Sequence, residues 1–575
     1  MRYLKLISLT FLFGLLYVIP LSAQQPESYF THTISKGETL YSIAGMYNVS
    51  TDEIIRLNPS CASVVKVGEV IKIPQRATQT SPIIYYTIKK GDTLYSLSKK
   101  YNVSVENIIA ANPGLTPQTF SEGKVIRISR VPVQGSVQPV SKSPQQSLSS
   151  NCKEIHKAKR KDTPEKVAEK YNISLRALMD ANPEMKKVGY KMQKGDLICI
   201  PFETKSAVKT TWTIPAAKPM NDLKVGVVLP FKSDNKMEQD RMIEYYRGIL
   251  MAVDSLKTLG KNVEVFAYNS GKTPADMQSI LANANLQKCN LIFGPLYADQ
   301  LPVLAEFSNR MNCTVVAPFA GLNDKIYSCK NLFLVNPPKS YQYSNVYDGF
   351  VRMFKGQNII FYSTPGSTTE AADFIIGLKQ ALRNAGMNFQ IMQEHASEQQ
   401  MLKLVNLQKN NVIIPTSYGI TALNTVMTKF KAFMQAHPSY LFQLFGYPDW
   451  QAFQQYHLKN YYFMDTFIYT SFYNTSWRKR NLKFVNDYEK WFHTEMLNTH
   501  PKYPMLGFDT GFYFMKAMAT YGSSFIYHLK EIQTEPYQND FTFNRVNNWG
   551  GFVNEEVKFI HYTRKGTTEI LDFTK

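Results

Sequence analysis

One internal repeat constrains the fold of the first third of this chain more than any other feature. The segment Lys36–Ile43 reads KGETLYSI, and Lys90–Leu97 repeats it as KGDTLYSL. A weaker third copy, Lys161–Val167, reads KDTPEKV. A tyrosine and then an asparagine follow at the same spacing in every copy: Tyr47 and Asn58, Tyr101 and Asn112, and Tyr171 and Asn182. Self-similarity with several positions in register is the signature of repeated structural units, so we expect three copies of one small fold.

Each copy predicts the same order of elements: strand, helix, helix, strand. In the first copy, Thr31–Ser35 predicts the opening strand and Val70–Ile73 the closing strand. The second helix begins at a capping box formed by Ser50 and Glu53, and it ends before Pro59. The first helix has one apolar stripe at i, i+3, i+4 and i+7, formed by Leu40, Ile43, Ala44 and Tyr47. These βααβ units are α+β folds near the lower size limit for a stable core.

These repeats resemble LysM domains, which bind N-acetylglucosamine-containing glycans such as peptidoglycan or chitin. The resemblance covers residues 30–75, 84–130 and 151–202, and the third copy is divergent. In that family the glycan lies in a shallow groove between the first strand–helix loop and the loop before the last strand. The resemblance implies glycan contacts at Gly37, Glu38, Thr39, Leu40, Asn58 and Pro59, and at Gly91, Asp92, Thr93, Leu94, Asn112, Pro113, Gly114 and Leu115. The alternative is that these Gly and Thr residues only form the turn and the helix cap.

The third copy departs from this pattern. Lys161 stands in place of the glycine, and Pro164 in place of the leucine, so glycan binding by this copy stays open. Cys152 precedes its first strand, and Cys199 lies in its last strand. LysM domains with cysteines at these places carry a bridge between them, so the resemblance implies a Cys152–Cys199 disulfide.

The N-terminus predicts export. Arg2 and Lys5 precede an apolar run, Leu6–Leu21, and Ala23 offers a cleavage point, so residues 1–23 are interpreted as a signal peptide. A membrane anchor is the alternative, but the run is short for a span and contains Pro20. We therefore expect a periplasmic or cell-envelope protein.

The formal net charge of +20 favours anionic partners, with cell-wall polymers and membrane surfaces as the candidates. We expect no nucleic-acid partner, because the chain is exported and has no recognisable binding motif. The alternative is that dispersed lysines only solvate the surface.

Polar segments separate the predicted units. Residues 76–82 form a short linker, 131–150 are rich in Ser, Gln, Pro and Val, and 203–221 form a third linker. Such composition is typical of flexible spacers. We therefore expect units that are tethered to one another and not packed together.

From residue 222 onward the pattern changes to alternating strands and helices, which predicts an α/β domain with parallel sheets. The expected strands of a first lobe are Lys224–Leu229, Val263–Tyr268, Leu291–Gly294 and Thr314–Ala317, with helices at Met242–Leu259, Pro274–Ala284 and Ala298–Asn309. The pattern restarts after a helix at Tyr341–Phe354, with strands at Asn358–Tyr362, Val412–Ile414 and Leu441–Phe445. Two such lobes enclose a cleft, which is the usual place for a ligand.

Residues 222–575 resemble the type I periplasmic-binding-protein fold. The resemblance is carried by Val228–Phe231, Tyr246–Ile249, Ile292–Pro295, Val316–Pro318, Leu444–Tyr447 and Gly507–Thr510. That family includes amino-acid-binding proteins of transporters and lipoprotein activators of peptidoglycan synthases. Its amino-acid binders place small hydroxyl residues where this chain has bulky or apolar ones. The candidate residues for a ligand in this cleft are Tyr297, Phe319, Ser363, Thr364, Ser417 and Tyr418. Ordinary loop polarity is the alternative for the hydroxyl residues, and Asp509 is interpreted as a helix cap.

No catalytic or metal-binding motif is present in the sequence. The six cysteines include no C-x-x-C pair, and Cys289, Cys313 and Cys329 are interpreted as core residues of the first lobe. We expect no cofactor and no metal ion.

The sequence therefore favours a non-enzymatic, exported cell-wall protein that binds peptidoglycan glycan through its repeats. Its bilobed domain would then sense a small ligand or bind a protein partner in the envelope. The alternative is a solute-binding protein of an ABC-type transporter, for an amino acid or a peptide, that is tethered to the wall. A third interpretation is a degenerate binding fold that serves as a scaffold.

Overall fold

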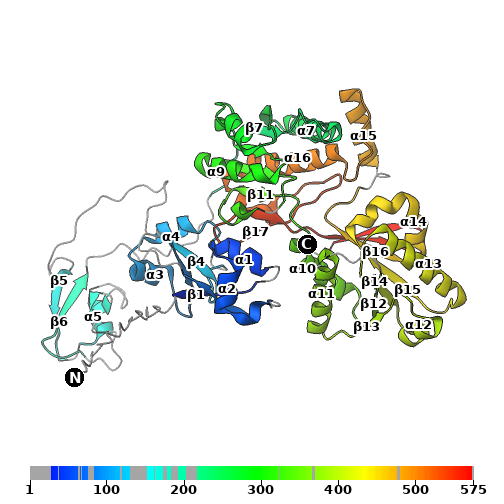
Figure 1. Cartoon of the computed structure of the whole chain (residues 1–575). Helices are drawn as coiled ribbons and strands as arrows, with labels where there is room; N and C mark the ends of the chain where they lie inside the picture. The colour runs from blue at the N-terminus through cyan, green and yellow to red at the C-terminus, as the bar shows by residue number, and fades with distance from the viewer. Residues whose placement is uncertain are drawn as a thin grey trace, which may run out of the picture. The chain divides into compact units, whose positions relative to one another are not determined.

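This computed structural model describes residues 28–572, apart from 36–37, 63–64, 66–67, 76–82, 117–118, 130–151, 161, 172–177, 180, 183–184, 186–191, 202–215, 322, 365–368 and 475–478. The predicted signal peptide, the linkers at 76–82 and 131–150 and most of the linker at 203–221 lie outside the described residues. Within the described part, no helix is long and apolar enough to cross a membrane. The chain divides into two compact units, residues 1–133 with 217–575, and residues 134–216 (Figure 1).

The first two copies have the predicted βααβ order. Thr39 caps α1 by accepting a hydrogen bond from the Ser42 amide, and Ser50 forms the predicted capping box with Glu53 at the start of α2. In each copy the opening and closing strands pair antiparallel. The first copy consists of β1 (Tyr29–Thr33), α1 (Leu40–Tyr47), α2 (Thr51–Leu57) and β2 (Val70–Pro74), and the second of β3 (Ile83–Thr87), α3 (Leu94–Tyr101), α4 (Val105–Ala111) and β4 (Val125–Ser129).

The third copy keeps the same frame. Strands β5 (Cys152–Lys157) and β6 (Leu197–Pro201) pair antiparallel, and α5 (Pro164–Lys170) begins with Pro164 in its first turn after a Thr163 cap. A small core that includes Val167, Leu178, Ile198 and Ile200 holds it together. Most of the residues expected to form its second helix lie outside the described residues.

The first lobe of the α/β domain is built on a seven-stranded sheet with the order β17-β18-β11-β10-β9-β7-β8, parallel except at its β17 edge. Helices α8 (Pro274–Leu281) and α9 (Leu301–Met311) pack on one face, and α7 (Lys236–Thr258), α15 (Lys479–Phe492) and α16 (Tyr503–Tyr521) pack on the other. Its strands are β7 (Asp222–Leu229), β8 (Asn262–Asn269), β9 (Leu291–Phe293), β10 (Thr314–Ala317), β11 (Leu332–Leu334), β17 (Phe543–Arg545) and β18 (Phe552–Asn554).

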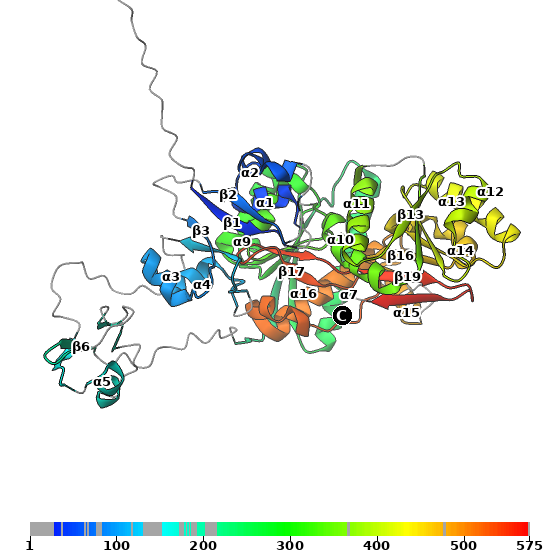
Figure 2. The same cartoon turned by 90° about the horizontal axis from the view of Figure 1, so that it is seen from below.

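The second lobe repeats this plan with the sheet order β13-β12-β14-β15-β16-β19-β20. The last two strands come from the C-terminal end of the chain and join antiparallel beside β16, as Figure 2 shows. Its strands are β12 (Asn358–Tyr362), β13 (Phe389–Met392), β14 (Asn411–Pro415), β15 (Phe442–Gly446), β16 (Thr466–Thr470), β19 (Lys558–Tyr562) and β20 (Thr568–Asp572), and its helices are α10 (Ser340–Met353), α11 (Thr369–Asn384), α12 (Glu398–Leu404), α13 (Ile420–Ala436) and α14 (Gln454–Phe463).

The two lobes share one topology. The first five strands of each lobe follow the order 2-1-3-4-5, a doubly wound arrangement that places ligands at the carboxyl ends of the strands. The chain passes between the lobes after β11, after β16 and after β18. The predicted bilobed α/β architecture is therefore confirmed. Strands β11, β13, β16 and β17–β20 were not predicted, and α7 begins before the predicted Met242 because Asn235 caps it.

The closest helix packing in the first lobe joins α7 to α16, which lie side by side (Figure 1). A β-carbon added at Gly248 would lie 2.0 Å from the carbonyl oxygen of Pro504. A β-carbon at Gly507 would lie 2.0 Å from the carbonyl oxygen of Tyr245. The two backbones therefore touch, and only glycine fits at these positions.

The expectation of loosely tethered repeats is wrong for the first two copies. The ring of Phe30 in the first copy stacks on Tyr85 in the second, with centroids 5.4 Å apart. Trp549 of the first lobe packs against both copies, 6.3 Å from the ring of Tyr47 and 5.6 Å from that of Tyr85. The composition of a linker reports only its own stiffness, and the apolar faces of the flanking units decide whether those units pack.

We expect Gly248→Ala to destabilise the first lobe by about 1–3 kcal/mol, because the new methyl group must push two helix backbones apart. Urea unfolding followed by fluorescence measures this loss. Gly321→Ala is the matched control, since a β-carbon there meets no atom within 4 Å. Equal stability of the two variants would contradict the packing described above.

Candidate functional site

The first strand–helix loop of each repeat is closed by an acidic side chain. In the first copy, Glu38 accepts a hydrogen bond from the Ser35 amide at 2.6 Å and contacts His32 Nε2 at 2.8 Å. The other ring nitrogen of His32 lies 2.8 Å from the Tyr47 hydroxyl. Glu38 therefore links the opening strand to the start of the first helix.

The other two copies repeat this arrangement. Tyr86 takes the place of the histidine in the second copy and donates to Asp92 at 2.8 Å. In the third copy, His156 lies 2.8 Å from Asp162 and 2.9 Å from the Tyr171 hydroxyl. Sequence analysis did not single out this contact. The repeat could have revealed it, because positions 32, 86 and 156 are equivalent in the register of the three copies and each carries a side chain that can bind the acidic residue.

The asparagine at the end of the second helix joins that helix to the closing strand. Asn112 is fully buried, and its amide donates to the carbonyl oxygens of Ile108 and Arg127 at 2.7 and 2.6 Å. Its oxygen accepts the Arg127 amide at 2.8 Å. Asn58 and Asn182 make the same contacts in the other copies. All three side chains thus have a structural role, which the sequence analysis did not assign.

The other predicted groove residues differ in exposure. Gly91 has φ +87°, which favours glycine, and no atom lies within 4 Å of a β-carbon built there. Gly37 lies outside the described residues. The exposed members of the predicted grooves are Thr39, Pro59, Gly91 and Thr93, the half-buried members are Glu38, Leu40, Asn58, Asp92, Pro113 and Gly114, and the buried members are Leu94, Asn112 and Leu115.

The candidate cleft residues of the first lobe contact other side chains of the same lobe. The Tyr297 hydroxyl donates to Glu238 at 2.5 Å, and burial together with this carboxylate raises the pKa of Tyr297 to about 12. The ring of Phe319 packs edge-on against Tyr245 at 4.9 Å and lies 5.8 Å from Tyr503. Both aromatic residues therefore belong to the packing at the carboxyl ends of the strands.

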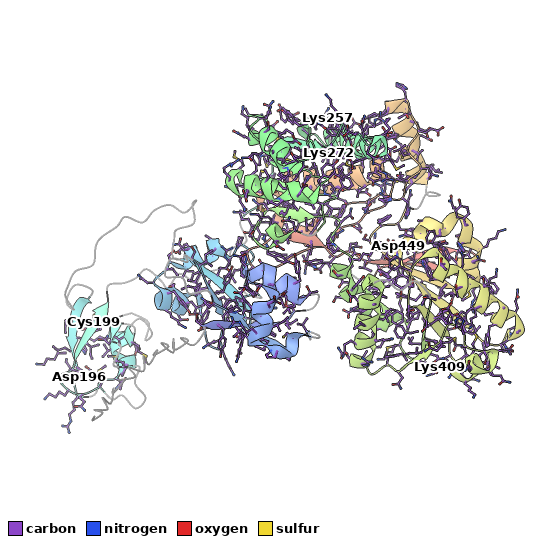
Figure 3. All side chains as sticks on the ribbon, viewed as in Figure 1. Asp196, Cys199, Lys257, Lys272, Lys409 and Asp449 are labelled. Atoms are coloured by element: carbon purple, nitrogen blue, oxygen red, sulfur yellow. The ribbon has the colours of Figure 1, made fainter. Side chains whose placement is uncertain are left out.

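The second lobe fills the corresponding place with aromatic rings. The ring of Tyr418 lies 5.9 Å from that of Tyr447. The Lys339 ammonium is 5.2 Å from the centre of the Tyr418 ring and 2.9 Å from the carboxylate of Asp449. Figure 3 labels Asp449 on this lobe. The cavity left among these side chains is about 10 Å³, about the least volume that holds one water molecule. It is lined by Lys339, Tyr343, Ala371, Phe374, Tyr418, Tyr447, Asp449 and Tyr469.

The hydroxyl candidates of the second lobe lie at the ends of β12 and β14. The Thr364 amide donates to the Thr416 hydroxyl at 3.0 Å, and the Ser363 amide donates to the Met392 carbonyl at 2.9 Å. Ser417 is buried, with 3% of its surface exposed. The structure thus brings Thr364, Ser417 and Tyr418 to one edge of one sheet, where local hydrogen bonds already involve Thr364 and Tyr418.

A larger hollow of about 450 Å³ opens on the second lobe, outside the predicted cleft residues. Lys429 lies in it, donates to the Glu394 carbonyl, and has its pKa lowered by burial. Sequence analysis did not point to this hollow. Its lining residues are Tyr362, Glu394, His395, Asn424, Thr425, Thr428 and Lys429.

Asp509 lies on α16 and binds a loop. Its carboxylate accepts backbone N–H groups from Tyr537, Gln538 and Asn539 at 2.7, 2.9 and 2.8 Å. Burial raises the pKa of Asp509 to about 7, against the effect of these donors. The helix-cap interpretation is therefore wrong in detail: the side chain anchors the segment that precedes β17.

The first-lobe cysteines are buried thiols. Burial raises the pKa values of Cys289 and Cys313 to about 12, and it also raises the pKa of Cys329. All three lie in the core cluster of the lobe, as the core interpretation predicts. A thiol with a raised pKa is a poor nucleophile at neutral pH.

The predicted disulfide belongs to the third copy. Cys152 pairs in register with Pro201, which places it two residues along the strand from Cys199, labelled on β6 in Figure 3. The side chain of Cys152 lies outside the described part of the structure, so the Cys152–Cys199 disulfide stays a prediction.

The LysM domain model matches residues 32–74, 86–129 and 156–201. The chain therefore carries three LysM domains, including the divergent third copy. Among curated proteins, N-acetylmuramoyl-L-alanine amidase sle1 of Staphylococcus epidermidis is 27% identical over 177 residues, covering 30% of this chain and 52% of that protein. The Staphylococcus aureus protein of the same name is 25% identical over 171 residues, 28% of this chain and 50% of that protein. The chain thus spans about half the length of the curated relatives it matches.

Solved structures similar to the chain include ABC transporter substrate-binding proteins. One from Desulfitobacterium hafniense in complex with Leu is 13% identical with a TM-score of 0.37, and a putative branched-chain amino acid ABC transporter from Rhodospirillum rubrum is 12% identical with a TM-score of 0.43. Each match covers 61% of this chain and 100% of the other chain. The doubly wound lobes and their three crossings define the part from residue 222 onward as an α/β domain of the type I periplasmic-binding-protein class.

Asp509→Asn tests the buried carboxylate. We expect the free energy of unfolding to fall by about 1–3 kcal/mol. Both carboxylate oxygens of Asp509 accept hydrogen bonds from backbone N–H groups, and the NH2 group of an asparagine cannot accept them. The native chain should also lose stability relative to the variant as pH rises from about 4 to 7. The folded state keeps a proton that the unfolded chain releases in this window, because the folded pKa is about 7. Urea unfolding at pH 5 and pH 8 measures both effects, and identical pH dependence in the two proteins would contradict this role.

Proposed function

We propose that this chain is a non-enzymatic, exported envelope protein that LysM domains hold on peptidoglycan. Its bilobed domain would engage a small ligand or a protein partner in the envelope. The observation that carries the proposal is the presence of three LysM domains, of which the first exposes Thr39 and Pro59 on the two loops of its predicted groove.

The geometry of the first groove suits a neutral glycan. Two described residues of its loops are held by contacts behind them, Glu38 by His32 and Asn58 by the closing strand, so these residues are already in place before binding. A preformed groove loses less conformational entropy when a ligand binds. Three further features agree with a location in the cell envelope. They are the predicted signal peptide at residues 1–23, the net charge of +20 and the predicted Cys152–Cys199 disulfide.

The bilobed domain favours a partner other than a free amino acid. The second-lobe face at the strand ends is filled by the rings of Phe374, Tyr418, Tyr447 and Tyr469. The remaining cavity of about 10 Å³ is far below the roughly 300–1,000 Å³ of small-molecule sites. The residues that amino-acid binders use for a carboxylate are replaced by Tyr297 and Phe319, and both are engaged in contacts within the lobe.

We expect Pro59→Glu to weaken binding of the full-length chain to peptidoglycan. An unpaired carboxylate at an exposed groove wall would lose its water against a sugar, which should cost at least about 1.4 kcal/mol, or about tenfold in affinity. Pelleting with purified peptidoglycan over a range of polymer concentrations measures this change.

Ser28→Glu is the control for that experiment, because it adds the same charge at an exposed position outside the predicted groove. Equal pelleting of Pro59→Glu and the native chain would contradict glycan binding by the first groove. A native chain that stays in the supernatant would contradict the proposed function as a whole.

The alternative function is a solute-binding protein that delivers an amino acid or a peptide to a transporter. Thermal unfolding in the presence of leucine, short peptides or soluble muropeptides separates the two functions. We expect no shift in Tm with leucine, because the second-lobe face is filled. A ligand present at 100 times its Kd would stabilise the fold by about 2.7 kcal/mol. A leucine-dependent rise of several degrees would favour the alternative.

A further inference from the structure

The loop between β17 and β18 is a hairpin of the first lobe that several hydrogen bonds hold in shape. The Asn547 side chain accepts the N–H groups of Trp549 and Gly550 at 2.9 and 2.5 Å. Arg545 lies behind the loop and donates to the carbonyl oxygens of Gly550 and Lys330. These contacts hold the tip of the hairpin, which consists of residues 545–550 and includes the half-buried Asn548.

The tip of this hairpin meets the second LysM domain at its predicted groove. The Gly114 N–H donates to the backbone oxygen of Asn548 at 2.6 Å. The side-chain amide of Asn548 donates to the Val125 carbonyl at 3.2 Å. Asn548 thus presents one carbonyl acceptor and one N–H donor to the LysM backbone. The N-acetyl group of a sugar offers the same pair of hydrogen-bonding groups.

The contact leaves no room for a side chain at Gly114. A β-carbon built there lies 2.7 Å from Cδ of Arg545 and 3.0 Å from the oxygen of Asn548. The equivalent position of the first copy, in the register of the repeat, is the exposed Ser60. The LysM fold therefore accepts a side chain at this place. The hairpin, and not the LysM fold, requires glycine in the second copy.

Trp549 anchors the hairpin between the two LysM domains. It is 3% exposed, and the Arg127 guanidinium lies 5.5 Å from the centre of its ring. Tyr47 and Tyr85 form the other walls of this site, one from each LysM domain. The first groove differs at the equivalent proline, because Pro59 is exposed whereas Pro113 of the second groove is half-buried.

We infer that the hairpin at residues 545–550 is an internal ligand of the second LysM groove, where it takes the place of the N-acetyl group of an N-acetylglucosamine-containing glycan. This inference rests on the proposed glycan-binding function. The docked hairpin covers the Gly114 side of the second groove, while Gly91 and Thr93 on its other loop stay exposed, and in the first groove the equivalent Ser60 is exposed. The two contacts compete, so each one weakens the other. By linkage, the factor by which the docked hairpin lowers the affinity for glycan equals the factor by which bound glycan lowers the affinity of the hairpin for the second LysM domain.

Gly114→Ser in the full-length chain tests this inference. It gives the second copy the residue that the first copy already has, and the added side chain displaces Asn548 and Arg545. Isothermal titration with chitohexaose, a soluble N-acetylglucosamine oligomer, should show one more binding site per chain than the native protein. Ser60→Ala is the matched control and should leave the number of sites unchanged, because no hairpin covers Ser60.

Hydrogen exchange gives the second measurement. In the native chain the amide of Gly114 should be protected, and in Gly114→Ser the segments 112–125 and 545–550 should exchange at least tenfold faster. Protection of β10 in the core of the first lobe should not change, which shows that the variant is folded.

The outcomes separate the two proposals. A native chain that binds chitohexaose, with no additional site in Gly114→Ser, overturns the internal ligand and leaves the glycan function standing. Fast exchange at Gly114 in the native chain also overturns it. A native chain and a Gly114→Ser variant that both fail to bind chitohexaose contradict glycan binding by these domains, and the internal ligand falls with it.

Discussion

The contact of Trp549 with two LysM domains is the interaction on which the arrangement of the larger unit depends. Its ring meets Tyr47, Tyr85 and the Arg127 guanidinium, and so it joins three parts of the chain at one buried point. Aromatic pairs of this kind contribute about 0.5–1.5 kcal/mol beyond the area that they bury. The first two LysM domains therefore share a core with the first lobe. A glycan that binds these two domains would therefore also fix the position of the first lobe.

In the second lobe, aromatic side chains fill the carboxyl ends of the strands. The doubly wound topology places ligands at the carboxyl ends of strands. Here Tyr418, Tyr447 and Tyr469 occupy that place, and the Lys339–Asp449 ion pair lies beside them. Partly exposed ion pairs of this kind contribute little to the stability of a fold. We therefore expect the aromatic packing to stabilise this edge of the sheet more than the ion pair does. These strand ends thus leave little room for a small solute, and the larger hollow of this lobe lies elsewhere, beside Lys429.

Much of this architecture was predictable from sequence periodicity. The LysM units follow from apolar stripes and caps such as Ser50 with Glu53, and the alternating strands and helices predicted two lobes. The short strands β17–β20 escaped prediction, because three to five residues at the end of a chain carry too little periodic signal. The roles of Asn112 and Asp509 also escaped, since their hydrogen-bond partners lie 15 to 30 residues away.

The sequence by itself determined the three repeats, the bilobed class of the large domain and the list of loop residues from which a glycan groove is built. Local spacing is enough for these features, because helix stripes and strand alternation depend on neighbouring residues. Only the tertiary structure decided which groove residues remain exposed. Gly114 is half-buried because a hairpin from the far end of the chain presents Asn548 to it. Contacts between segments so far apart depend on the shape and packing of whole domains, which no local pattern records.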